Sequence, residues 1–217
     1  DRSLGRRIFL LILFGAAMGY FEASVVVYIR EIYFPEGFSF PLPPVPMPMA
    51  VIEIGREAAS IIMLVAFAGL AGTRLWERFG YFIAAFGIWD IFYYIWLKAA
   101  IGWPSSLFEP DILFLIPVPW TGPVIAPALV SILLTGFGIA ILSRSARGVE
   151  IRFPMISPIF GASGILIIFY TFVFDYHQVI RQRPPEPYPY AIFGIGFMLL
   201  LFACRVSLWG GSRRDGA

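Results

Sequence analysis

An aspartate near the middle of a long apolar run constrains this chain more than any other feature. The run extends from Tyr81 to Trp103, and Asp90 lies near its centre. At about 1.5 Å per helical residue, such a run can cross a hydrocarbon layer of about 30 Å. A charged side chain at that depth costs on the order of 3 kcal/mol against lipid. We therefore expect Asp90 to face protein or water, with polar partners supplied by other helices.

Apolar runs of this kind fill almost the whole chain. Hydrophobic residues make up 59% of the 217 residues and charged residues only 14%, whereas soluble domains average about a quarter charged. The runs are too long for barrel strands and lack their alternation. The sequence therefore predicts a single all-α domain over residues 1–217. We expect a polytopic transmembrane bundle of about six helices, with spans near residues 8–29, 49–71, 81–101, 123–142, 158–174 and 191–209.

The segment before the fourth span is interrupted by prolines. Residues 112–127 read ILFLIPVPWTGPVIAP, and each proline removes a backbone donor and clashes with the preceding helical turn. Broken backbone at membrane depth has to be buried in protein or line a cavity. We therefore expect a short interfacial or re-entrant piece over residues 112–118, and we take it as a pointer to a site nearby.

The basic residues predict the orientation of the bundle. Under the positive-inside rule, arginines gather on the cytoplasmic side of a membrane. Eleven of the sixteen basic residues fall on the side of the two chain ends: Arg2, Arg6, Arg7, Arg74, Arg78, Arg144, Arg147, Arg152, Arg205, Arg213 and Arg214. We expect both termini in the cytoplasm, and proline-rich outer loops at residues 33–48 and 184–190 that cap the opposite side.

Ionisable residues recur at one depth in the first three spans. Glu22 and Glu57 both lie about 12–13 Å below the outer ends of their helices, and Asp90 lies slightly deeper. Charges facing lipid at these depths would be too costly, so they must converge. We predict a buried polar cluster in the outer half of the bundle, made of Glu22, Glu53, Arg56, Glu57, Asp90, Tyr94 and Lys98. Asp175 and His177 are expected at the outer mouth of the fifth span.

Three uses of this cluster are open. It can be a structural network, in which Arg56 pairs with Glu22 or Asp90. It can be a proton or cation pathway, which needs only carboxylates at graded depth. It can be a metal centre like those of carboxylate-rich helical bundles, although the chain lacks the Glu-x-x-His spacing of such centres. The candidate metal ligands are Glu22, Glu53, Glu57, Asp90 and His177.

The cysteine and histidine counts exclude several classes of cofactor. One cysteine, Cys204, allows no disulfide within the chain and no cysteine-ligated cluster built by this chain alone. One histidine excludes a bis-histidine haem. No nucleotide-binding or metalloprotease motif is present, which favours a protein that is not an enzyme. We expect lipid as the surrounding medium, other membrane subunits or further copies of the chain as partners, and no nucleic acid.

Three stretches resemble a group of small multi-pass membrane proteins found in bacteria. They are WDIFYY at residues 89–94, GWP at residues 102–104 and IPVPWTGP at residues 116–123. The resemblance covers mostly spans two to four and brings no known activity, substrate or cofactor. We expect the chain to lie in the bacterial inner membrane. The first functional hypothesis is a non-catalytic subunit or binding protein of a larger membrane assembly. The alternatives are a proton- or cation-coupled carrier and an intramembrane metalloenzyme.

Overall fold

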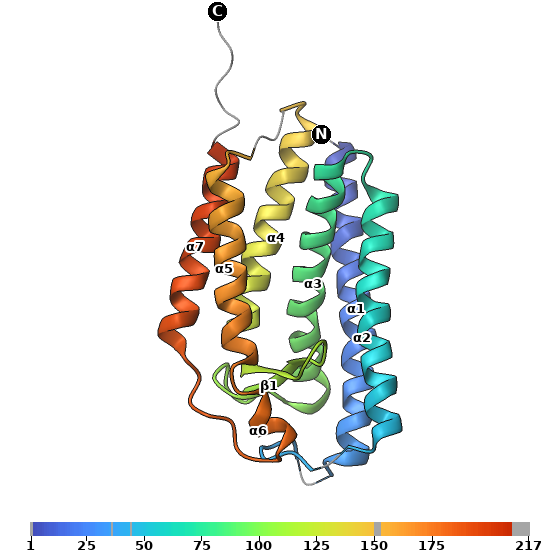
Figure 1. The fold of residues 1–217 in the computed structure, drawn as a ribbon. Helices are drawn as coiled ribbons and strands as arrows, with labels where there is room; N and C mark the ends of the chain where they lie inside the picture. Colours follow the sequence, from blue (N-terminus) through green and yellow to red (C-terminus); the bar gives the residue numbers. More distant parts are fainter. Residues whose placement is uncertain (1, 36, 44, 150–152, 210–217) are drawn as a thin grey trace, which may run out of the picture.

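The chain forms an elongated bundle of antiparallel helices (Figure 1). The computed structural model describes residues 2–35, 37–43, 45–149 and 153–209, without the side chains of Arg2 and Trp209. Within these residues the long helices are α1 (Arg2–Tyr33), α2 (Met47–Ala71), α3 (Leu75–Ile101), α4 (Ile125–Ala146), α5 (Ile156–Val173) and α7 (Tyr190–Trp209). A short helix, α6 (Tyr176–Ile180), follows α5, and two strands, β1 (Pro110–Phe114) and β2 (Trp120–Pro123), precede α4. The predicted all-α bundle is confirmed.

Five helices of the described part are long and apolar enough to cross a membrane. They are α1, α3, α4, α5 together with α6, and α7. The helix predicted at residues 49–71 is present as α2, which lies beside α1 (Figure 1) but is not among the five. Its first half carries Glu53, Arg56 and Glu57. The chain therefore has the architecture of a multi-pass membrane protein, and the crossing by α2 stays a prediction.

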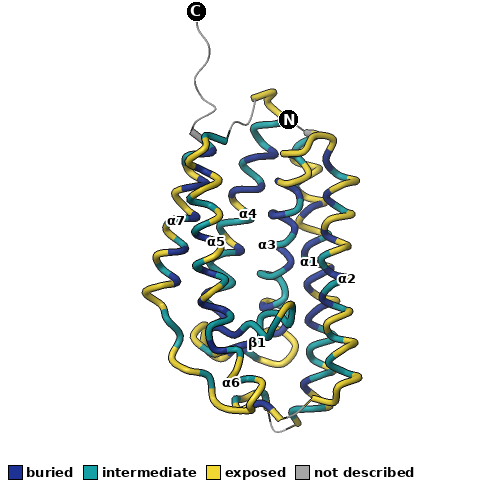
Figure 2. Tube along the Cα trace, in the orientation of Figure 1, coloured by how far each residue is buried: buried dark blue, intermediate teal, exposed yellow. Residues whose placement is uncertain are grey.

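The outer surface of the bundle is as apolar as its interior. Figure 2 shows exposed residues along the helix faces that point away from the bundle. Among them, Leu70 is 91% exposed and Ile62 is 67% exposed. Large side chains of this kind are costly in water and neutral in hydrocarbon. This surface suits a lipid environment. The feature that needs an explanation is the set of polar side chains inside the bundle.

Close helix contacts at glycines position the polar interior. A Cβ atom on Gly19 of α1 would lie 2.9 Å from the Trp89 carbonyl oxygen of α3, so only glycine allows this approach. A Cβ atom on Gly87 of α3 would collide with the Ser131 carbonyl oxygen and the Thr135 hydroxyl of α4. Small residues allow helix backbones in membranes to approach closely. Because α3 is in close contact with both α1 and α4, its polar side chains reach partners on each.

An antiparallel β-hairpin crosses the bundle at the end remote from the chain termini (Figure 1). Asp111 pairs with Gly122 and Ile112 pairs with Thr121. The predicted interfacial or re-entrant piece at residues 112–118 is thus one arm and the tip of a hairpin over residues 110–123. Strand pairing satisfies backbone groups in a segment whose prolines exclude a helix. The fourth helix begins at Ile125, two residues after the predicted start of the fourth span.

Candidate functional site

Three of the four predicted acids of the first three helices, Glu22, Glu57 and Asp90, line one cavity in the bundle. Its volume is about 70 Å³. The lining residues come from α1, α2, α3 and β1: Glu22, Val26, Arg56, Glu57, Trp89, Asp90, Tyr93, Tyr94, Ile112, Leu113 and Phe114. A single water needs roughly 10–15 Å³ of such space. The cavity therefore has room for several waters among three carboxylates and one guanidinium group.

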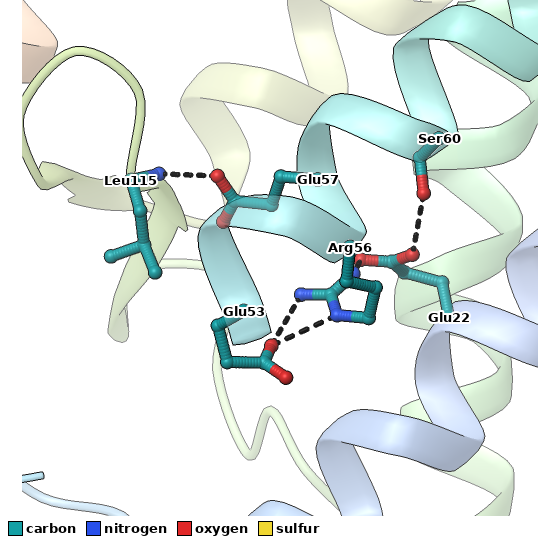
Figure 3. A network of polar contacts seen from close by, with 6 residues as sticks. All are labelled: Glu22, Glu53, Arg56, Glu57, Ser60 and Leu115. Atoms are coloured by element: carbon teal, nitrogen blue, oxygen red, sulfur yellow. Dashed lines mark hydrogen bonds and ion pairs between the residues drawn. The ribbon is translucent and has the colours of Figure 1, made fainter. Parts of the chain in front are cut away.

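Arg56 holds two carboxylates at one side of the cavity (Figure 3). Its Nη1 pairs with Glu22 Oε1, and its Nη2 lies 2.7 Å from Glu53 Oε2. Ser60 Oγ donates to the other oxygen of Glu22 at 3.4 Å. This ion-pair network joins α1 to α2, as the structural interpretation of the sequence anticipated for Arg56 and Glu22. Glu53 takes part only through Arg56, since it does not line the cavity.

Glu57 connects α2 to the tip of the hairpin. Its carboxylate is turned away from Arg56, and Oε2 accepts a hydrogen bond of 2.8 Å from the Leu115 backbone N–H (Figure 3). The residue is only 6% exposed. Glu57 forms no salt bridge with any residue in the described part of the chain. A buried carboxylate without a cationic partner is costly, and taking up a proton removes that charge.

Asp90 connects α3 to α4. Its Oδ2 accepts a hydrogen bond of 2.8 Å from the Ser131 hydroxyl, and Ser131 is almost fully buried. Asp90 also makes no salt bridge within the described residues. Ser131 was not predicted as a site residue, because a serine in an apolar run gives no signal by itself. The aspartate expected at mid-helix thus has a polar partner on the next helix and borders the cavity.

A second ion pair lies beside the cavity and was not predicted. Arg30 Nη2 is 3.2 Å from Asp111 Oδ1, and the Tyr94 hydroxyl donates to Asp111 Oδ2 at 3.2 Å. The Arg30 guanidinium lies over the rings of Trp103, 3.8 Å from its centroid, and Phe38. Burial in the hairpin raises the pKa of Asp111 to about 6, although Arg30 and Tyr94 act in the opposite direction. Arg30 and Asp111 are 81 residues apart in the chain, and no motif or spacing in the sequence indicates that they form an ion pair.

Lys98 does not belong to the cluster, so this part of the prediction is wrong. Its side chain is exposed, and Nζ donates to the carbonyl oxygens of Gly102 at 2.9 Å and Pro104 at 2.7 Å. Lysines in the last helical turn commonly satisfy carbonyl groups that have no partner within the helix. The spacing from Asp90 placed Lys98 on the same face, but it lies two turns closer to the end of α3.

Asp175 and His177 lie apart from the cavity. Asp175 is buried where α5 ends, and its Oδ2 accepts a hydrogen bond of 2.6 Å from the Glu186 backbone N–H. His177 on α6 is exposed, and its ring packs on that of Tyr176. Within the described ranges, no three histidine, cysteine, aspartate or glutamate side chains lie close enough to hold a metal ion. Three of the candidate metal ligands, Glu22, Glu57 and Asp90, line the same cavity, but in the described residues they do not form a group that could hold a metal ion.

Comparisons with models of known protein families, with curated proteins and with solved structures find no match. The resemblance to small bacterial membrane proteins stays a prediction. The interpretation of the site rests on its chemistry, which is that of carboxylates from separate helices bordering a space large enough for water. Two of these carboxylates, Glu57 and Asp90, are held by neutral donors instead of a basic side chain.

Proposed function

We propose that this protein is a proton-coupled membrane carrier in which Glu57 and Asp90 take up and release protons. The observation that carries the proposal is that two carboxylates from different helices border one cavity without a salt bridge in the described residues. Carboxylates inside a membrane domain that face a cavity are typical of proton relays. Water in the cavity would connect the two groups.

Proton binding fits the cavity better than binding of a metal ion. Calcium needs six to eight oxygen ligands, and magnesium needs an octahedral set. The described residues offer no group of three acidic or metal-binding side chains at such spacing. A proton needs one carboxylate at a time and a chain of hydrogen bonds. The proposal therefore narrows the wider class of proton- or cation-coupled carriers to proton coupling.

The other polar residues of the site would hold the helices and the hairpin in position while protons are exchanged. Arg56 pairs with Glu22 and Glu53, and these ion pairs hold α1 against α2 at one side of the cavity. Glu57 holds the hairpin through Leu115, and Asp90 holds α4 through Ser131. Protonation or deprotonation of Glu57 would alter its hydrogen bond to the hairpin, and the same event at Asp90 would alter its hydrogen bond to α4. This arrangement links protonation to the position of the hairpin or of α4.

The proposal includes the bacterial inner membrane, with both chain ends in the cytoplasm. The first residues of α1, the α2–α3 turn and the end of α4 lie at the same end of the bundle (Figure 1). Of the eleven bases counted for that side, Arg6, Arg7, Arg74, Arg78, Arg144, Arg147 and Arg205 belong to described segments near it. Arg152, Arg213, Arg214 and the side chain of Arg2 lie outside the described residues.

Infrared difference spectroscopy on the purified protein in lipid tests the proposal without knowledge of the substrate. A change of pH should produce a carboxylic-acid carbonyl band that weakens in Asp90→Asn and in Glu57→Gln. The matched control is Glu31→Gln, an exposed acid of α1 outside the cavity. Proteoliposomes with an entrapped pH dye should show proton flux that Asp90→Asn abolishes. Unchanged bands and unchanged flux in both cavity variants would reject proton exchange at this site.

A second candidate is a non-catalytic subunit or binding protein of a larger membrane assembly. The observation that favours it is the exposed apolar surface of α2, where Met47 is 75% exposed and Leu70 is 91% exposed. A neighbouring membrane helix could cover this face as well as lipid could. Purification under mild detergent conditions should then recover a stoichiometric partner. A chain that purifies alone and still moves protons would favour the carrier.

A further inference from the structure

A second pocket opens at the end of the bundle where the hairpin lies. Its volume is about 230 Å³, and it shares no lining residue with the buried cavity. It is bordered by the base of the hairpin, the end of α5 and the segment before α7. Four aromatic rings and two acids dominate its wall: Phe108, Phe174, Tyr188, Tyr190, Asp175 and Glu186.

The aromatic wall of this pocket is built outward from one anchored ring, that of Tyr188. The Tyr188 and Tyr190 rings meet edge to face with centroids 5.1 Å apart, and Phe108 continues the row at 6.4 Å from Tyr190. The Tyr188 hydroxyl lies 2.9 Å from the Thr171 hydroxyl, which is fully buried. A Cβ atom on Gly122 would be 3.3 Å from the Tyr188 ring, so glycine lets this ring approach β2. Tyr188 is thus anchored before any ligand arrives, and the more exposed rings of Tyr190 and Phe108 extend the wall from it.

The charged side chains that line the pocket, Asp175 and Glu186, are both acidic. Asp175 is 4% exposed and is oriented by the Glu186 backbone N–H. The Glu186 side chain is exposed at the rim, where Oε1 accepts a hydrogen bond from Gln178. None of the lining residues in the described structure is basic. The pocket therefore repels anions and attracts cations.

We infer that this pocket binds a small organic ammonium ion. Aromatic faces attract cations through their quadrupoles, and a nearby carboxylate adds a direct charge interaction. A bare metal ion would need more oxygen ligands than the wall supplies, whereas an alkylated ammonium group fits a wall that is largely apolar. The volume lies below the roughly 300–1,000 Å³ of pockets for drug-sized ligands, which favours a small ion. The site is independent of proton exchange in the buried cavity.

Choline chloride and its neutral isostere 3,3-dimethylbutan-1-ol provide the test. The two molecules match in shape and differ in charge. Ligand-observed NMR on the full chain in lipid nanodiscs should give saturable choline binding at least about tenfold tighter than binding of the alcohol. Binding to the alcohol with equal affinity would show an apolar pocket only. The absence of saturable choline binding would also overturn the inference.

Variants locate the binding on the pocket wall. Glu186→Gln at the exposed rim should weaken choline binding several-fold, and the added change Asp175→Asn should bring the loss to about tenfold or more. Tyr190→Leu should weaken binding, whereas Tyr190→Phe should retain it, because the ring supplies the attraction. Glu31→Gln, an acid outside this pocket, should change nothing. Choline affinity that survives both Glu186→Gln and Tyr190→Leu would place the ion elsewhere and reject the site.

Discussion

Arg56 is the residue on which the charge balance of the cavity depends. It is the one basic side chain among the lining residues described, and it contacts both Glu22 and Glu53. Removing one partner of a buried ion pair leaves an uncompensated charge and typically costs about 3–5 kcal/mol. We predict that Arg56→Ala strongly lowers the midpoint of thermal unfolding in detergent. Arg181→Ala, at an exposed arginine, should leave the midpoint unchanged.

Removing the two acids together with Arg56 tests whether the lost stability comes from unpaired charge. When Arg56→Ala is combined with Glu22→Gln and Glu53→Gln, no uncompensated charge remains, so part of the lost stability should return. Equal midpoints for the single and the triple variant would show that packing of the arginine stem, and not its charge, held α1 to α2.

Asp111 gives a pH dependence whose sign can be worked out. Its pKa is about 6 in the folded chain and has an ordinary value of 3.8. The folded chain therefore holds this proton more tightly, and the resulting stabilisation, present below about pH 4, is lost as pH rises through 6. We predict that this group lowers the free energy of unfolding by about 3 kcal/mol as pH rises from about 4 to about 6.

Comparison with Asp111→Asn isolates this contribution, since Asn does not titrate. The charged or titratable groups that interact electrostatically with Asp111 are Arg30, Asp90, Tyr93 and Tyr94. Unfolding midpoints measured between about pH 4 and 7 should fall more steeply for the native chain than for the variant. If the native chain instead became more stable than the variant as pH rises, the ion pair with Arg30 would stabilise the charged form of Asp111 more than burial destabilises it.

At the scale of elements, the contact between α3 and α4 determines whether Asp90 reaches Ser131. Gly87 faces the Ser131 carbonyl oxygen and the Thr135 hydroxyl with no space for a Cβ atom. We predict that Gly87→Ala destabilises the chain by about 1–3 kcal/mol, because backbone cannot move aside as a side chain can. The same change should alter the carboxylic-acid infrared band, since the helices separate at Asp90.

Gly136 of α4 is the matched control for this change. Nothing lies within 4 Å of a Cβ atom built on it, so Gly136→Ala adds a methyl group in open space. Replacing glycine by alanine in a helix interior favours the helix by about 0.5–1 kcal/mol. We therefore expect a small rise in the unfolding midpoint. A similar loss of stability in both variants would contradict a specific role for the α3–α4 contact.

The elements themselves were the part of the structure that the sequence predicted best. The apolar runs predicted the long helices, since length and hydropathy act locally. The prolines of residues 112–127 excluded a straight helix but did not reveal the hairpin, because strand pairing is a contact between segments. Depth along each run placed Glu22 and Glu57 at one level and Asp90 slightly deeper. It could not show that Ser131 and Leu115 supply their hydrogen bonds or that Lys98 turns away to the end of α3.

At the scale of the whole molecule, the two ends of the bundle differ in chemistry. The end with the chain termini gathers arginines near helix ends, such as Arg74 and Arg147. The opposite end holds the hairpin, proline-rich segments and the acids of the aromatic pocket. The positive-inside rule therefore supports the proposal that the basic end lies in the cytoplasm. The orientation also decides which side of the membrane supplies a ligand to the aromatic pocket.

Labelling of single cysteines in intact bacterial cells tests this orientation. Cys204 is the one cysteine of the chain, and it is changed to serine first. Arg147→Cys and Arg183→Cys then place a thiol at exposed positions, after α4 and after α6. An impermeant maleimide should label residue 183 in intact cells and residue 147 only after lysis. The reverse pattern would invert the bundle, so that the aromatic pocket would face the cytoplasm and sample cytoplasmic ammonium ions.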